Sequence, residues 1–228
     1  MNHSATELSP ESFGPKDILM PEKLPRWALD RTIDDTDTDY VSLFPDLAGP
    51  IAVAAAAVER NGSVAIADIG CGTGNMLASL VLATLERTDC EPHQIRADGV
   101  NLNDHRRDSQ NDATRQAIAD GRIGYKEGRG ESLPDMSSDK YDVVLSIEAL
   151  MYSERPDLWL REMRRIGCPG ATLFFTAPFP PRFRRPTLGH RELIRWQNMG
   201  DRLKHCASTQ SGSGSRWMHY YRAEKNAN

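Results

Sequence analysis

The feature that most constrains this chain is a glycine loop at residues 68–75, Asp-Ile-Gly-Cys-Gly-Thr-Gly-Asn. The preceding residues 63–69 are apolar and β-branched, as in a short buried strand, and residues 75–87 repeat apolar side chains at helical spacing. Glycines at such a junction permit positive φ and let a ligand approach the free N–H groups of the helix closely. The loop is therefore expected to hold a nucleotide-like ligand.

The spacing of the glycines argues against the common dinucleotide and phosphate loops. A G-x-G-x-x-G fingerprint requires glycine at position 75, where this chain has Asn75. A P-loop requires Gly-Lys-Ser/Thr after its glycines, and the loop contains no lysine. NAD, FAD, ATP and GTP are therefore disfavoured. An ordinary glycine turn in some other α/β protein stays open as the alternative for the loop taken alone.

Strand and helix patterns alternate along the chain and predict an α/β fold with a parallel sheet. Strands are expected at residues 63–69, 96–102, 123–127, 141–147 and 171–177, and helices at 47–60, 75–87, 104–120 and 156–166. After residue 178 the pattern weakens. Residues 188–206 are predicted to form a helix, residues 208–215 a loop, and residues 216–222 a final strand.

Length and composition favour one globular domain with a short appendage. The chain has 228 residues, of which 39% are hydrophobic, and no apolar run approaches the ~20 residues that span a bilayer. Residues 1–45 are polar, proline-rich and acidic towards their end, so they form an N-terminal arm that resists regular structure, and residues 46–228 form the ligand-binding domain. The amino terminus has no secretion signal, so we expect a soluble, cytoplasmic protein without membrane contact.

The net charge and the spacing of the cysteines limit which kinds of partner and bound metal are expected. The formal net charge is −4, whereas a protein whose main partner is nucleic acid is usually basic. The cysteines are widely spaced without a CxxC pair, so neither a disulfide framework nor a metal site is expected. The expected partner is a small-molecule substrate, with no nucleic acid, and the expected assembly is a monomer or a homodimer.

Five segments together resemble the class I S-adenosylmethionine (SAM) dependent methyltransferases. Residues 68–74 are similar to that family's Asp-x-Gly-x-Gly-Thr-Gly, and residues 128–134, Gly-Arg-Gly-Glu-Ser-Leu-Pro, to its Gly-Asp-Ala-Glu-x-Leu-Pro. Residues 141–146, Tyr-Asp-Val-Val-Leu-Ser, resemble Phe-Asp-Val-Val-x-Ser, and Arg161-Glu-Met-Arg-Arg, then Pro-Gly-Ala, follow in the family's order. The likeness spans residues 64–178. It implies a single Rossmann-like, doubly wound domain with a mostly parallel, seven-stranded sheet flanked by helices and closed by a hairpin.

The resemblance implies SAM as cofactor and S-adenosylhomocysteine as product, and it places the cofactor contacts. Asp68 is expected to support the loop and the methionine amino group, or else to cap N–H groups of the turn. Asn101 stands where the family has a ribose-binding acid, and either contacts the ribose or only begins a turn. Arg129 replaces an acid and either stacks on the ligand or is solvated. The remaining expected contacts are Gly70, Cys71, Gly72, Gly74, Leu102, Gly130, Glu131 and Ser146.

The acceptor side is expected beyond the fourth strand. Glu148 and Tyr152 are the leading candidates for substrate contact, with Glu148 acting as a general base or binding the cofactor's ammonium group. His190 is a further catalytic candidate or a capping residue. The arginines at 182, 184 and 185 either meet an anionic substrate or lie in a solvated loop. The arm residues Trp27, Arg31 and Tyr40 either fold over the cofactor as a lid, as in similar enzymes, or belong to a flexible leader.

Three functions stay open from the sequence. The first is methyl transfer to a small-molecule acceptor at O, N or C, in secondary or specialised metabolism. The second is an RNA or protein methyltransferase, for which an added basic domain or an Asn-Pro-Pro-Tyr signature is expected, and residues 146–149 lack the signature. The third is a SAM-binding scaffold without catalysis, which the replacements at Asn101 and Arg129 favour.

Overall fold

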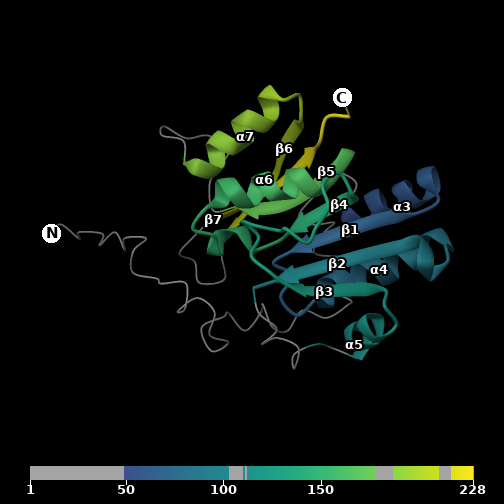
Figure 1. Ribbon diagram of the computed structural model, residues 1–228. Helices are drawn as coiled ribbons and strands as arrows, with labels where there is room; N and C mark the ends of the chain where they lie inside the picture. The colour runs from purple at the N-terminus through teal and green to yellow at the C-terminus, as the bar shows by residue number, and fades with distance from the viewer. Residues whose placement is uncertain (1–48, 103–109, 111, 178–186, 211–216, 228) are drawn as a thin grey trace.

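A twisted sheet forms the centre of the protein (Figure 1). The computed structural model describes residues 49–102, 110, 112–177, 187–210 and 217–227. Within them the sheet has seven strands in the order β3-β2-β1-β4-β5-β7-β6. The first five are parallel, and β7 is antiparallel to both of its neighbours. Their bounds are β1 Val64–Ile69, β2 Ile95–Asn101, β3 Ile123–Glu127, β4 Tyr141–Ser146, β5 Gly167–Ala177, β6 Arg202–Gln210 and β7 Trp217–Glu224.

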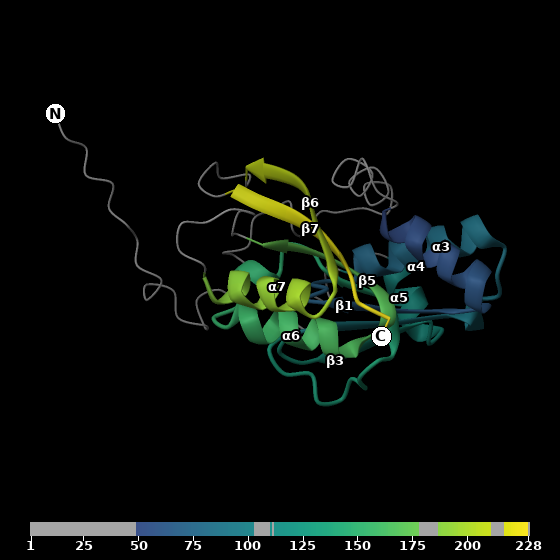
Figure 2. The ribbon, with the colours of Figure 1, turned by 90° about the horizontal axis from the view of Figure 1, so that it is seen from above.

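Helices cover the sheet in two layers, which the view from above separates (Figure 2). One layer holds α3 (Pro50–Asn61), α4 (Asn75–Thr88) and α5 (Asp112–Ala119), and the other holds α6 (Pro156–Ile166) and α7 (Leu188–Asn198). Two short 3-10 turns, η4 (Pro92–Gln94) and η6 (Leu150–Tyr152), precede β2 and follow β4. Each layer buries its own apolar cluster against the sheet. This arrangement confirms the expected single, doubly wound α/β domain.

Local sequence explains where the helices begin and end. Pro50 and Pro156 each occupy a first-turn position, where the missing N–H costs nothing. Helix α3 ends at Gly62, whose φ of 73° lets its N–H donate to the Val58 carbonyl at 2.7 Å. Helix α6 buries apolar side chains at helical spacing, namely Trp159, Leu160, Met163 and Ile166. No helix in the described ranges is long and apolar enough to cross a membrane.

The sequence-based assignment of the carboxyl-terminal part was wrong in one respect. Residues 188–206 were expected to form one helix, but α7 ends at Asn198 and β6 begins at Arg202. Gly200 adopts a φ of 86°, which a continuing helix does not allow, and the buried Asp201 accepts both guanidinium hydrogen bonds of Arg164. Residues 208–210, expected in a loop, extend β6 through its pairing with β7. The predicted closing hairpin is therefore present and longer than expected.

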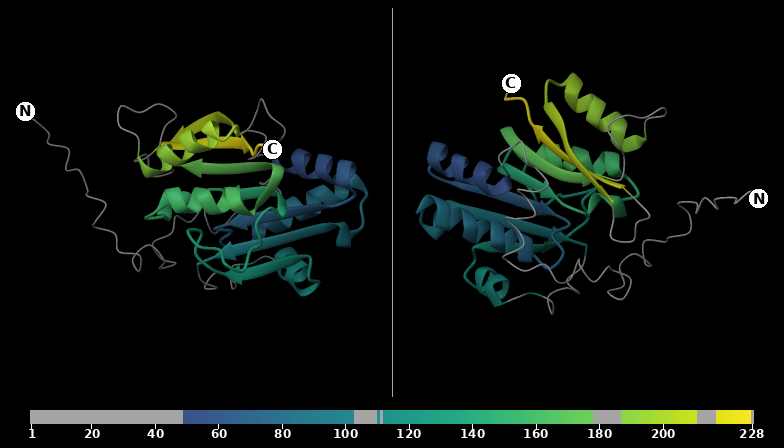
Figure 3. Two further views of the ribbon diagram at one scale, coloured as in Figure 1. Left: turned by 45° about the horizontal axis from the view of Figure 1, so that its top comes forward. Right: turned by 180° about the vertical axis from the view of Figure 1, so that it is seen from behind.

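The connection from β3 to β4 contains no helix over residues 128–140, all of which the structure describes. Arg165 on α6 fastens this segment by donating to the carbonyls of Leu133 at 2.8 Å and Met136 at 2.9 Å. Glu162 completes the attachment by accepting the Leu133 N–H at 2.9 Å. In Figure 1, α6 lies in front of β4 and β5, while the front of β2 and β3 carries no described helix; the view from behind in Figure 3 shows α3 and α4 across the other face. Residues 128–140 therefore connect β3 to β4 beside α6 without forming a helix.

Candidate functional site

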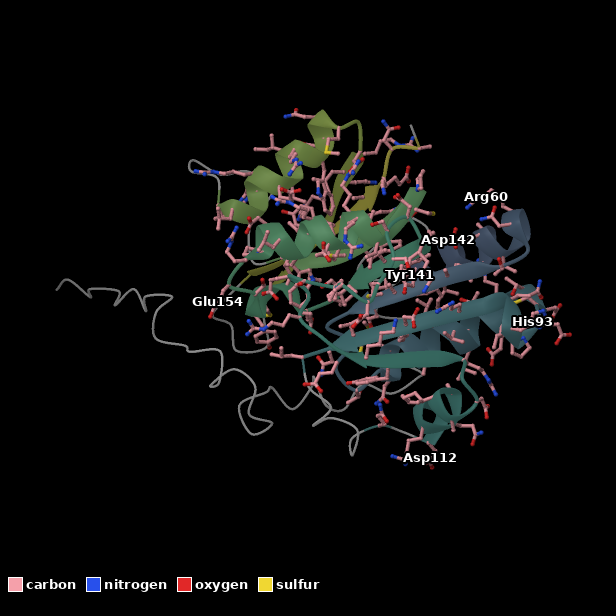
Figure 4. All side chains as sticks on the ribbon, viewed as in Figure 1. Arg60, His93, Asp112, Tyr141, Asp142 and Glu154 are labelled. Atoms are coloured by element: carbon pink, nitrogen blue, oxygen red, sulfur yellow. The ribbon has the colours of Figure 1, made fainter. Side chains whose placement is uncertain are left out.

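The predicted site residues meet at the carboxyl edge of the parallel strands. The register pairs Ile69 with Val100 and Asp68 with Leu145, so the ends of β1, β2 and β4 are neighbours. Figure 4 labels Glu154 at this edge, whereas Arg60 and His93 lie at the opposite, amino edge. Ligands of open α/β sheets bind at the carboxyl edge, where the strand order reverses around β1 and β4.

The glycine loop has the backbone geometry that only glycine adopts without strain. Gly70, Gly72 and Gly74 have φ angles of 82°, 57° and 80°. The N–H groups of Gly70 and Cys71 both donate to the Val100 carbonyl, at 2.7 and 3.0 Å, which fixes the loop against β2. A Cβ on Gly70 would overlap the side chain of Ala149. The four expected loop contacts therefore lie on one tightly turned segment that leads into α4.

Three side chains that the sequence did not mark brace this loop from the β3 and α5 side. The Tyr125 hydroxyl donates to the carbonyl of Gly72, and the Gln110 amide donates to that of Thr73 at 2.8 Å. The Thr114 hydroxyl donates to the Asn75 side chain at 2.8 Å. All three partners are distant in sequence, so periodicity gives no signal for them. They hold the loop in one conformation before any ligand binds.

Asp68 carries a buried carboxyl group whose burial is explained best by a bound ligand. Its side chain is fully buried, and neither carboxylate oxygen has a hydrogen-bond partner among the described residues. This desolvation raises the pKa of Asp68 to about 7. The alternative expectation, that Asp68 caps N–H groups of the turn, is therefore not met. A ligand ammonium group beside the loop would satisfy this carboxylate, so the site fits the methionine end of SAM.

The expected adenine loop is joined to both of its neighbours. The Gly128 N–H donates to the Asn101 carbonyl at 2.8 Å, which places Asn101 and Leu102 at the turn from β2 beside this loop. The Ser153 hydroxyl donates to the Glu131 carboxylate at 2.6 Å, so Glu131 connects the adenine loop to the residues that follow η6. Glu131 therefore does more than shape the pocket edge, since it links the cofactor side to the acceptor side.

The acceptor candidates lie on a strained turn after β4. Glu148 has a φ of 55°, which is costly for a residue with a side chain, and its N–H donates to the Thr176 hydroxyl at 2.6 Å. Tyr152 closes η6 with 37% of its surface exposed. Strain of this kind persists only where the surroundings enforce it, and it concentrates at functional sites. Glu148 and Tyr152 thus follow β4 at the carboxyl edge, and their contact with an acceptor stays a prediction.

Trp159 is a site residue that sequence reasoning missed. Its indole N–H donates to the Ser146 hydroxyl at 3.0 Å, and its ring lies against Gly70 and Gly130. The only sequence signal was a large aromatic side chain on the buried face of a helix, which is typical of any core position. Its contacts with residues assigned to the cofactor become visible only in the folded chain.

The structure gives His190 a structural position. It is the N3 residue of a capping box at the start of α7, where Thr187 accepts its N–H at 3.4 Å and contacts its ring nitrogen at 2.8 Å. These contacts agree with the capping alternative, and a catalytic role for His190 stays a prediction. The arginines at 182, 184 and 185 and the arm residues Trp27, Arg31 and Tyr40 lie outside the described residues.

The glycine loop and the buried, unpaired carboxylate define an α/β protein that binds a nucleoside ligand with a cationic group. Residues 67–175 match the family described as "Methyltransferase domain". Residues 67–175 therefore form a SAM-dependent methyltransferase domain of the class I type, with S-adenosylmethionine as its cofactor. None of the curated proteins compared with the chain matches it.

Solved structures share the fold at low sequence identity. A putative class I SAM-dependent methyltransferase from Listeria monocytogenes is 16% identical with a TM-score of 0.57, covering 96% of this chain and 71% of that protein. The [4+2]-cyclase SpnF is 17% identical with a TM-score of 0.54, covering 78% and 82%. Magnesium protoporphyrin IX methyltransferase from Synechocystis, with bound SAM, is 13% identical with a TM-score of 0.50, covering 77% and 78%. At these identities the likenesses establish the fold alone.

Proposed function

We propose that this methyltransferase acts on a small-molecule acceptor and transfers the methyl group by direct in-line displacement to an oxygen, nitrogen or carbon atom. The observation that carries the proposal is the buried Asp68 at the glycine loop, which has no hydrogen-bond partner among the described residues and lies on the strand next to β4, the strand that Glu148 follows. The formal net charge of −4 also favours a metabolite over nucleic acid.

In methyl transfer the protein mainly positions the cofactor and the acceptor, and none of its own side chains has to form a covalent bond. When bound, the cofactor would supply an electrophilic methyl carbon; an electron pair of the acceptor, a lone pair on oxygen or nitrogen or a π pair on carbon, would form the new bond as the carbon–sulfur pair returned to sulfur. Asp68 holds the ammonium group, and the loop from Gly70 to Gly74 holds the adenosyl portion close to the backbone. Glu148 accepts the proton that a hydroxyl or protonated amine acceptor releases, and Tyr152 contacts the acceptor. The strained turn keeps Glu148 at a fixed position.

Calorimetry with SAM and S-adenosylhomocysteine, followed by transfer of a labelled methyl group, tests this function. We expect both ligands to bind the full chain, and Gly72→Asp to abolish binding because it puts a carboxylate side chain into the loop. Gly121→Asp is the matched control, since Gly121 also has a positive φ of 70° but faces open space before β3. Equal binding by wild type and Gly72→Asp would refute the site.

Labelled transfer then separates the acceptor classes. Label in a metabolite fraction, and none in bulk RNA or protein, supports the proposal. Label in RNA or protein contradicts it and favours a macromolecular acceptor. Ligand binding with no transfer to any fraction favours the scaffold or a different reaction, of which the cyclase with a similar fold is an example. The cytoplasm and a monomer or homodimer remain our predictions for location and assembly.

A further inference from the structure

We propose that Trp159 is a positioning residue for SAM, whose indole sets the spacing between the three segments that hold the cofactor. The inference rests on the SAM-binding site described above and assigns a function to α6, which carries none of the residues matched to cofactor contacts. The three segments are the glycine loop, the adenine loop at residues 128–134, and the end of β4. They come from distant parts of the sequence, so something has to fix their relative positions.

Each segment touches a different part of the indole. The six-membered ring faces Gly70, where a Cβ would lie 3.3 and 3.5 Å from its Cζ2 and Cη2 atoms. The fused bond of the indole faces Gly130, and the ring N–H donates to Ser146 at 3.0 Å. Trp159 is only 8% exposed, so the ring fills the space between these segments and contributes little surface. One rigid side chain therefore sets all three distances.

Gly130 is the residue that reveals how closely the adenine loop rests on the ring. A Cβ added at Gly130 would overlap three atoms of the indole, Cδ2, Cε2 and Cε3. No positive φ requires glycine at this position, so close approach is the reason for it. The family pattern that these residues resemble has alanine here, which the indole of Trp159 does not permit in this chain. Gly130 and Trp159 thus form a size-matched pair.

A second buried tryptophan, Trp196, provides a comparison that distinguishes support of the cofactor site from ordinary core packing. Trp196 on α7 belongs to the same apolar cluster as Trp159 and is fully buried. Its ring packs edge-on against Phe175 at 5.9 Å, and neither Gly70 nor Gly130 lies against it. Both side chains contribute to the core, but only Trp159 touches the segments assigned to SAM. Trp196→Phe is therefore the matched control for Trp159→Phe.

The first experiment measures the Kd of S-adenosylhomocysteine by calorimetry, and the thermal midpoint, for the two variants. Both should lower the midpoint, since each removes part of a buried indole. Only Trp159→Phe should weaken ligand binding, by about tenfold or more, because a displaced cofactor segment is costly to affinity. The ligand-induced change in tryptophan fluorescence should also persist in Trp196→Phe and disappear in Trp159→Phe. Equal ligand affinity in both variants would overturn the proposal.

A double-mutant cycle tests the pair directly. Gly130→Ala should weaken binding in the wild-type background, where the new methyl meets the indole. The same substitution should have little effect in the Trp159→Ala background, where the space is open. Additive effects would contradict the size-matched pair. If wild type itself binds neither SAM nor S-adenosylhomocysteine, the SAM site fails; if wild type binds and the cycle is additive, only the role of Trp159 fails.

Discussion

Replacing Asp68 by asparagine should make the ligand-free protein more stable at alkaline pH. The asparagine side chain keeps the shape of the carboxyl group and resembles its neutral form. In the folded, ligand-free protein the pKa of Asp68 rises from 3.8 to about 7, because burial disfavours the charge. This change corresponds to about 4 kcal/mol against the ionised form. Asp68→Asn should therefore gain up to about 4 kcal/mol in unfolding free energy at pH 8 and almost nothing at pH 4.

The direction follows from proton binding in the two states. Between pH 4 and pH 7 the native protein holds a proton on Asp68 that the unfolded chain has released, so the unfolding free energy falls as the pH rises. Urea unfolding of the ligand-free wild type and Asp68→Asn, at several pH values across this range, measures the difference. Asp68→Asn should also bind S-adenosylhomocysteine about tenfold more weakly at pH 8, since it loses a charge-assisted hydrogen bond.

Asp98 on the neighbouring strand provides a control of opposite sign. Burial alone would raise the pKa of Asp98, but the hydrogen bond from Tyr141 and the charges of Lys126 and Lys140 outweigh it and lower this pKa. The stability that Asp98 contributes is present at neutral pH and lost on acidification, so Asp98→Asn should destabilise the protein at pH 8. The Asp98 carboxylate accepts a hydrogen bond from Tyr141, whereas the Asp68 carboxylate has no partner among the described residues. The two replacements should therefore change the unfolding free energy at pH 8 in opposite directions. A stability difference for Asp68→Asn that does not change between pH 4 and pH 8 would refute the reasoning.

Two further predictions address the loop and the acceptor turn. Tyr125→Phe removes the hydrogen bond to Gly72, so calorimetry should show S-adenosylhomocysteine binding weaker by about 1 kcal/mol with little change in thermal midpoint; unchanged affinity would mean that this brace is dispensable. Glu148→Gly should relieve the strain of its positive φ, raising the unfolding free energy by about 1 kcal/mol while labelled methyl transfer falls. Asp89→Gly relieves a similar φ of 50° away from the site and should leave transfer unchanged; equal transfer rates in both variants would count against Glu148.

Much of the fold was predictable because its signals are local. The order of strands and helices through β5, the glycine turn after β1 and the start of α6 at Pro156 all follow from short sequence patterns. The strand β6 was missed because residues 199–206 carry no strong strand pattern. Their conformation depends on pairing with β7 and on the ion pair between Arg164 and Asp201, which are contacts between distant residues.

Some features of the candidate site could likewise be predicted from the sequence, and others could not. The residues of the glycine loop, Asn101 and Ser146 were placed from motif and strand order, since the carboxyl ends of neighbouring parallel strands must meet at one edge. The unpaired state of Asp68 was not predictable, because it depends on which groups surround the carboxylate after folding. For His190 the sequence left a catalytic and a capping position open, and the folded chain shows the capping contacts.

The sequence by itself indicated a nucleotide-like ligand and placed the glycine loop between the first strand and the helix after it, because glycine spacing and hydrophobic periodicity are properties of short segments. The tertiary structure alone decided how those segments are held together. The indole of Trp159 against Gly130 and the hydroxyl of Tyr125 on Gly72 join residues that no local pattern relates. Such contacts form only in the folded chain, because a closely packed interior leaves each side chain a limited volume. A single added methyl group can then change which packing of the side chains is possible.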